Sequence, residues 1–152
     1  VVFGSQKSIN VENLNINIIY RNHLSDFSDI ISLYSCADIM AIPSRQDNLP
    51  LIAMEASACS LPIVSFDIGG LPDIVSNGKN GFLVQPFDTE EFANSLSLLI
   101  NNVELKEKMS LASRKLCSEK FNYQIVAKQY LEIYKKVIFK NWIFKLMYNI
   151  EF

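Results

Sequence analysis

Two carboxylates bracket the start of a predicted helix near the middle of the 152-residue chain. Asp47 lies in the polar loop 45–49, and Glu55 follows Pro50 by five residues. Proline suits the first position of a helix, because its missing N–H would have no intrahelical partner there. A helix start also presents unpaired N–H groups and the positive end of the helix dipole, which together can receive a phosphate or diphosphate. An acceptor on each side of this helix start could therefore bind hydroxyls at the two ends of a sugar nucleotide.

The segments around this helix predict a strand–loop–helix–strand unit. Apolar residues 39–42 are typical of a short buried strand, which Pro43 ends because proline cannot donate to a strand ladder. Good helix formers then run over 51–59. Pro62 ends that helix, and apolar residues 63–66 predict the next buried strand. Two buried strands joined through a helix indicate a βαβ unit and therefore a parallel sheet.

The turns at the predicted strand ends hold further candidate binding residues. Ligands of doubly wound sheets bind at the carboxyl ends of the strands. Gly69 and Gly70 follow the strand 63–66, and adjacent glycines permit a close approach between the backbone and a ligand. Asn22 and His23 follow a predicted strand over 16–20, where a nucleobase pocket is expected, although a capped strand end with an exposed His23 explains them equally well. His23 is the only histidine, and a lone histidine is a poor candidate for catalysis.

The whole pattern predicts a Rossmann-like α/β fold, which is a doubly wound parallel sheet of about five strands with helices on both faces. Residues 1–121 form this domain, and residues 122–152 form a C-terminal amphipathic helix and tail. Strands are also expected over 1–4 and 82–84, and a short helix over 71–76.

Three more helices are expected, over 26–36, 88–101 and 104–118. Asp26 resembles an N-cap for the first of them. Apolar spacing predicts the inward faces of the first two, which are Phe27, Ile30, Ile31 and Tyr34 in the first and Phe92, Leu96, Leu99 and Ile100 in the second.

The composition, with 49% hydrophobic and 20% charged residues, is that of one globular domain. The net charge is −2 and the acids and bases are interspersed, so no basic patch indicates a nucleic-acid partner. The cysteines Cys36, Cys59 and Cys117 are widely spaced, which favours reduced, mostly buried thiols in a cytoplasmic protein over a metal site. Asp38 is more readily explained as structural than as catalytic. Without an initiating methionine or a signal peptide, we expect the chain to be a fragment of a longer polypeptide.

The C-terminal segment combines aromatic residues with Lys135, Lys136, Lys140 and Lys145. The favoured interpretation is a terminal helix that packs on another domain of a longer chain. The alternative is peripheral contact with the inner face of a membrane through residues 135–152, because aromatics and lysines suit the headgroup region.

A series of motifs in chain order resembles the C-terminal, donor-binding domain of retaining GT-B glycosyltransferases of the family 4 type. Pro43-Ser44 precedes Asp47, which is separated by seven residues from Glu55, and these two acids match the ends of that family's E-x7-E motif. The segments 59–64 and 69–73 continue the pattern, and 33–38 and 77–84 extend it over most of the chain. The loop Asn48-Leu49-Pro50 is similar to that of enzymes that build capsular, exopolysaccharide or lipopolysaccharide chains.

The resemblance implies a donor site for a UDP- or GDP-sugar. By position it makes Glu55 the ribose ligand and Asp47 the contact to the donor-sugar hydroxyls, while the backbone of Asn48, Leu49, Pro50 and Leu51 cradles the diphosphate and sugar. Backbone groups near Asn22 and His23 would contact the base, and Gly69 and Gly70 would lie near the ligand. No metal or other cofactor is expected, because no Asp-x-Asp motif is present. The acceptor would be a growing or lipid-linked glycan.

The sequence departs from the family pattern at several points. Asp47 is one methylene shorter than the usual glutamate, and Ser60 stands where a glycine is usual just past the helix. The opening residues 1–4 resemble the second strand of the family's donor domain, so its first strand, its basic phosphate-binding residues and the whole N-terminal acceptor domain are expected outside this chain. We therefore expect the chain alone to catalyse no transfer.

These departures leave room for other functions. A non-catalytic nucleotide-sugar-binding module, or a decayed transferase, is the main alternative. A phospho-receiver domain has a similar topology but needs an acidic cluster at the first strand ends, which residues 1–4 do not offer. A nucleotide-sugar epimerase has a related fold, without motif support here.

Overall fold

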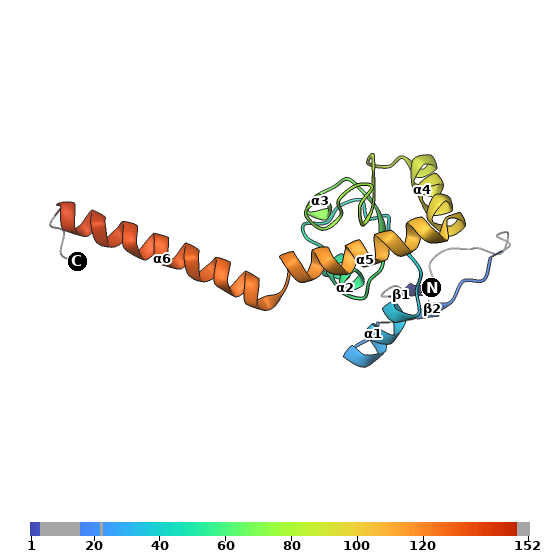
Figure 1. The fold of residues 1–152 in the computed structure, drawn as a ribbon, viewed down its shortest axis with the longest axis horizontal. Helices are drawn as coiled ribbons and strands as arrows, with labels where there is room; N and C mark the ends of the chain where they lie inside the picture. The colour runs from blue at the N-terminus through green and yellow to red at the C-terminus, as the bar shows by residue number, and fades with distance from the viewer. Residues whose placement is uncertain (4–15, 22, 149–152) are drawn as a thin grey trace.

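The computed structural model describes residues 1–3, 16–21 and 23–148, with side chains as far as residue 140. Strands and helices alternate along most of this part of the chain (Figure 1). The strands are β1 (Val2–Phe3), β2 (Tyr20–Arg21), β3 (Met40–Ile42), β4 (Ile63–Phe66) and β5 (Gly81–Val84). The helices are α1 (Phe27–Ser35), α2 (Leu51–Ala58), α3 (Leu71–Ile74), α4 (Thr89–Asn101), α5 (Val103–Lys120) and α6 (Tyr123–Tyr148).

Every pair of neighbouring strands in the described chain is parallel, which confirms the predicted α/β fold. The strands nevertheless form two sheets, of order β1-β2 and β3-β4-β5, instead of one continuous sheet. After β2 the chain passes through α1 to β3, which pairs with β4 and not with β1 or β2. In register, Val64 of the central strand β4 lies between Ala41 and Phe82.

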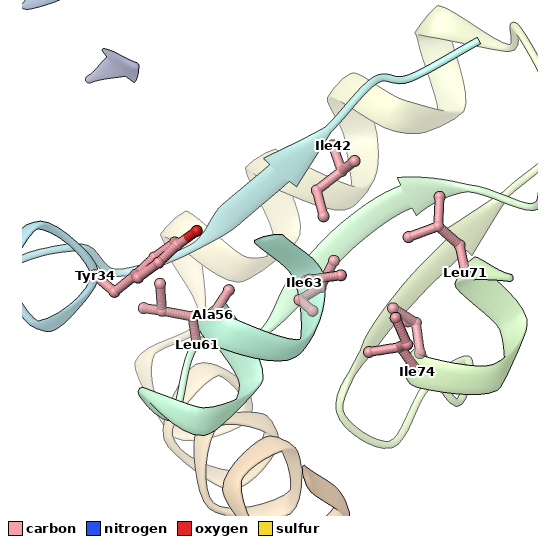
Figure 2. Packing of buried hydrophobic residues seen from close by; sticks show 9 residues of the cluster. Tyr34, Ile42, Ala56, Leu61, Ile63, Leu71 and Ile74 are labelled. Atoms are coloured by element: carbon pink, nitrogen blue, oxygen red, sulfur yellow. The ribbon is translucent and has the colours of Figure 1, made fainter. Parts of the chain in front are cut away.

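The strand β4 separates two apolar clusters. Ile63 belongs to a cluster with residues of α1, α2 and α3, whereas Val64 belongs to a cluster with residues of α4 and α5. Adjacent strand residues point to opposite faces, so each face of β4 contributes to one cluster. All four residues of β4 are buried, as expected for a parallel strand covered on both faces. Figure 2 shows the first cluster, with members Tyr34, Ile42, Ala53, Ala56, Leu61, Ile63, Leu71, Ile74 and Val75.

The small sheet joins this core through one aromatic contact. The rings of Phe3 in β1 and Tyr34 in α1 meet edge to face, with centroids 5.7 Å apart and planes at 89°. Edge-to-face pairs are a favourable geometry for aromatic rings. Tyr34 is therefore the residue at which α1, β1 and the first cluster meet.

Two of the predicted helix faces need correction. In α1, Ile30 and Tyr34 face the core, but Phe27 is 71% exposed and Ile31 is 43% exposed. No element in the described part of the chain covers that side of α1. In α4, Ile100 is 64% exposed, because one residue of helix turns it about 100° away from the buried Leu99.

The last helix, α6, extends away from the rest of the protein (Figure 1). It begins at Tyr123, next to the predicted start of the C-terminal helix. Tyr130, Leu131, Ile133 and Tyr134 are all more than half exposed. None of the described helices is both long enough and apolar enough to span a bilayer.

Candidate functional site

The loop that holds Asp47 lies directly against the turn that holds Gly69 and Gly70. These segments follow β3 and β4, whose carboxyl ends meet at one edge of the sheet because the strands are parallel neighbours. A methyl group added to Gly69 would overlap the backbone carbonyl oxygen of Asp47. One added to Gly70 would overlap the carbonyl oxygen of Asn48 and lie 2.8 Å from Cδ1 of Leu49.

This packing explains why glycine stands at both positions. The backbone of Gly69 has φ +51°, in the left-handed region that disfavours residues with a Cβ. The close approach seen here is between two loops of the protein. Contact of these glycines with a ligand stays a prediction.

We call the contact between the Asp47 loop and the Gly69–Gly70 turn the loop junction. The helix α2 begins beside it, without a side-chain cap. Pro50 is the N-cap, with φ −69° and ψ 117°, and the helix starts one residue later than predicted, at Leu51. The N–H of Ala53 donates to the carbonyl oxygen of Pro50 at 3.1 Å. The earlier N–H groups of a helix have no intrahelical acceptor, and no side chain accepts from them here. Pro50 is buried, while the Leu51 side chain is 68% exposed. The start of the helix therefore packs on the protein on one side and faces solvent on the other.

Glu55 is half-buried and takes part in a hydrogen bond that the sequence did not indicate. The hydroxyl of Tyr34 donates to Oε2 of Glu55 at 3.0 Å. Burial raises the pKa of Tyr34 far above its ordinary value, and the hydrogen bond to Glu55 raises that pKa further. Apolar spacing in α1 predicted the burial of Tyr34 but carried no signal for its partner, because the two residues are 21 positions apart.

The other end of α2 is closed by a left-handed cap. Ser60 has φ 65°, and its N–H donates to the carbonyl oxygen of Ser57 at 3.0 Å. The N–H of Leu61 donates to the carbonyl oxygen of Ala56 at 2.9 Å. These two bonds form a Schellman motif, in which glycine usually takes the left-handed position. The serine at position 60 is thus held in a conformation that disfavours its side chain.

The helix α5 fixes the position of α2. The hydroxyl of Ser113, buried between the helices, donates to the carbonyl oxygen of Leu61 at 2.7 Å and lies 3.1 Å from the hydroxyl of Ser57. The guanidinium of Arg114 donates to the carbonyl oxygen of Ala58. Hydrogen bonds of this kind hold the C-terminal end of α2 and leave its N-terminal end facing the loop junction.

The candidate base-binding residues are less defined. His23 is exposed and makes no hydrogen bond within the described part of the chain. Asn22 lies outside the described residues. The predicted nucleobase pocket therefore stays a prediction.

Other chemistry-bearing side chains lie apart from this junction. Asp38 forms an ion pair with Lys106 at 2.5 Å, near the opposite end of β3, which supports its structural interpretation. Cys59 and Cys117 are half-buried, and burial raises the pKa of both thiols, whereas Cys36 is exposed. Within residues 1–3, 16–21 and 23–148, no three His, Cys, Asp or Glu side chains gather as metal ligands.

Comparisons with known proteins place the chain among glycosyltransferases. A family model described as Glycosyl transferases group 1 matches residues 3–116. A D-inositol 3-phosphate glycosyltransferase of Saccharomonospora viridis is 32% identical over 110 residues, which are 72% of this chain and 25% of that protein.

Two solved structures share the fold. A sucrose-phosphate synthase from Thermosynechococcus elongatus superposes with a TM-score of 0.76 at 25% identity, over 84% of this chain and 32% of that one. Anabaena HepE in complex with UDP-glucose superposes with a TM-score of 0.72 at 23% identity, over 82% of this chain and 34% of that one. This chain thus spans between a quarter and a third of the length of these proteins.

Proposed function

Because this chain belongs to the Glycosyl transferases group 1 family, we propose that it is the donor-binding part of an enzyme that transfers a sugar from a nucleotide-diphosphate sugar to a growing glycan, with retention of configuration. The observation that carries the proposal is the start of α2. It has no side-chain cap and lies between Asp47 and Glu55 in the chain, and the loop that leads into it packs against the Gly69–Gly70 turn. This arrangement offers amide donors to a diphosphate and carboxylate acceptors to hydroxyls on both sides.

In this proposal the two carboxylates bind opposite ends of the donor. Glu55 accepts hydrogen bonds from the ribose, and Asp47 accepts them from the transferred sugar. The backbone from Asn48 to Leu51 binds the diphosphate, and the base lies toward Asn22 and His23. The donor is a UDP- or GDP-sugar, which the UDP-glucose bound by a protein of the same fold supports.

The leaving diphosphate would be stabilised by backbone N–H groups that the fold orients before the donor binds. Negative charge develops on the diphosphate as the bond to the sugar breaks, and the amides at the start of α2 are donors fixed near that charge. The remaining stabilisation would come from basic residues of a longer protein, with no metal ion. We expect the chain alone to bind a donor without transferring its sugar.

The sheet order supports a place in a longer protein. In the common doubly wound order 3-2-1-4-5-6, the first strand lies between the second and the fourth. The two sheets, β2-β1 and β3-β4-β5, match that arrangement if β1 corresponds to the second strand and β3 to the fourth. A strand from the longer protein would then join the two sheets, and a further domain would bind the acceptor.

The exposed face of α6 suits a partner outside this chain. Tyr130, Ile133, Tyr134 and Val137 are spaced to share one face, and each is more than half exposed. Residues 122–152 hold five lysines and two glutamates, whereas the rest of the chain is acidic. We propose that this face packs on the acceptor-binding domain of the longer protein.

Contact of α6 with a membrane is the competing explanation, and vesicles test it. If the face packs on protein, the chain will not sediment with vesicles of phosphatidylglycerol and phosphatidylcholine. Sedimentation that is lost when Lys135 and Lys136 are changed to glutamate would show a lipid partner instead.

A non-catalytic binding module is the second candidate function. The shorter Asp47 and the disfavoured φ of Ser60 support it, because both depart from the family pattern near α2. A longer protein that binds a donor sugar but transfers it to no acceptor would favour this alternative.

The donor site can be tested on the chain itself. We expect ligand-observed NMR to show binding of one class among UDP-, GDP- and ADP-sugars, and Glu55→Ala to abolish it. Glu91→Ala is the matched control, because Glu91 is exposed in the first turn of α4. Binding that survives Glu55→Ala would remove Glu55 from the site, and no binding by a folded chain would count against the proposed donor site.

A further inference from the structure

We propose that Tyr34 is a positioning residue that orients Glu55 toward the ribose of the bound nucleotide, an inference that rests on the proposed function. Its basis is the hydrogen bond of 3.0 Å from the Tyr34 hydroxyl to Oε2 of Glu55. This bond links α1 to α2, two helices on either side of β3 in the chain.

The donor in this pair is held firmly. Tyr34 is 2% exposed and lies in the first apolar cluster with Ala56 and Leu61 (Figure 2). Phe3 packs edge to face on its ring. A closely packed aromatic ring has little freedom to change rotamer, so its hydroxyl stays at one place. The glutamate has three rotatable side-chain torsions and loses freedom when such a donor fixes one of its oxygens.

After it accepts the hydrogen bond from Tyr34, the Glu55 carboxylate still has acceptor sites for a ligand. An ionised carboxylate accepts only, with about four lone-pair sites on its two oxygens. Tyr34 occupies one site on Oε2, which leaves Oε1 and the remaining sites for a pair of vicinal hydroxyls. Because burial and Glu55 both raise the pKa of Tyr34, the phenol keeps its proton at physiological pH and remains a donor.

A purely structural role for the same bond predicts a different outcome. If the bond only satisfies a buried hydroxyl, removing it changes the stability of the fold and affects all nucleotides alike. If it orients Glu55, its loss weakens only those ligands whose ribose hydroxyls Glu55 binds. The ribose 2′-hydroxyl therefore distinguishes the two roles.

The test compares a nucleoside diphosphate with its 2′-deoxy analogue, using UDP and GDP as probes. Tyr34→Phe keeps the ring and removes the hydroxyl, and Tyr134→Phe removes an exposed hydroxyl from α6 as the matched control. We expect Tyr34→Phe to weaken binding of the ribonucleotide about three- to tenfold, which is the net contribution of one ordinary hydrogen bond. The affinity of the deoxy analogue, which keeps only the 3′-hydroxyl for Glu55, should fall less, and the affinities of the control variant should stay unchanged within about twofold.

The outcomes of this test distinguish failure of the proposed role of Tyr34 from failure of the proposed donor site. Equal weakening of both nucleotides, or no weakening, would overturn the role of Tyr34 and leave the donor site intact. A wild-type chain that binds neither nucleotide would overturn the proposed function and this inference with it. Should Tyr34→Phe unfold, Phe3→Leu provides a second comparison, because it removes the ring that packs on Tyr34 and leaves Glu55 unchanged.

Discussion

The two sheets of the protein differ in how completely they are covered. In the three-stranded sheet, Ile63 and Val64 of β4 have no exposed surface. In the two-stranded sheet, Val2 of β1 is 39% exposed, and Ile19, just before β2, is 54% exposed. Well-covered elements open only with the whole fold, whereas sparsely covered elements open locally at lower cost. The difference teaches that Asp47 and Glu55 lie in the well-covered region, whereas the predicted base pocket follows the sparsely covered sheet.

The strongest test of this comparison is truncation of matched isoleucines. Ile63→Ala removes a fully buried side chain and should lower the free energy of unfolding by about 4 kcal/mol. Ile31→Ala, on the exposed side of α1, should lower it by less than about 0.5 kcal/mol. Urea denaturation of both variants measures the difference, and equal losses would show that the side of α1 around Ile31 is covered.

A second test concerns the loop junction within the well-covered region. Gly69→Ala should destabilise the protein by about 3 kcal/mol, because its methyl overlaps the Asp47 carbonyl oxygen and its φ is +51°. Gly78→Ala is the matched control, with φ +75° and nothing within 4 Å of the added methyl. It should cost about 1 kcal/mol, from the left-handed backbone alone. Equal losses in chemical denaturation would contradict the tight packing of the two loops.

A smaller effect is expected at the cap of α2. Ser60→Gly should raise the free energy of unfolding by about 1 kcal/mol, because glycine adopts φ 65° without steric cost. Ser60→Ala keeps a Cβ and should give no gain. Thermal unfolding of the two variants measures the difference, and a Ser60→Gly protein no more stable than wild type would show that the cap carries no strain.

The smallest effect is a pH dependence at the contact between the two regions. The pKa of Tyr34 is raised above its ordinary value of 10.0, chiefly by burial. Above pH 10 the unfolded chain releases this proton first, so the free energy of unfolding falls as pH rises through 10 and beyond. Tyr34→Phe lacks this loss. The free energies of unfolding of the wild type and of Tyr34→Phe, plotted against pH, should therefore converge above pH 10. A constant difference between the two proteins would contradict a buried, hydrogen-bonded Tyr34.

Sequence reasoning succeeded where local chemistry decides the structure. Prolines 43, 50 and 62 mark the boundaries of the βαβ unit, and β4 was predicted residue for residue. Ser60, which stands where the family pattern usually has glycine, has a left-handed backbone. The contact between Asp47 and Gly69 was not predicted, although both residues lie in loops that follow parallel neighbouring strands.

The errors arose where distant segments decide the structure. Apolar spacing marked Phe27, Ile31 and Ile100 as inward, but spacing identifies an apolar face without saying what covers it. The split into two sheets depends on which strands pair, and pairing is not local. For the same reason, no pattern in the sequence joined Tyr34 to Glu55.

The contact between Gly69 and Asp47 has a mechanical consequence. The backbones of the two loops are in direct contact, so no side chain can be added at Gly69 without displacing the Asp47 loop. Because α3 begins at Leu71, directly after the glycine turn, a displacement of that turn would also displace the start of α3.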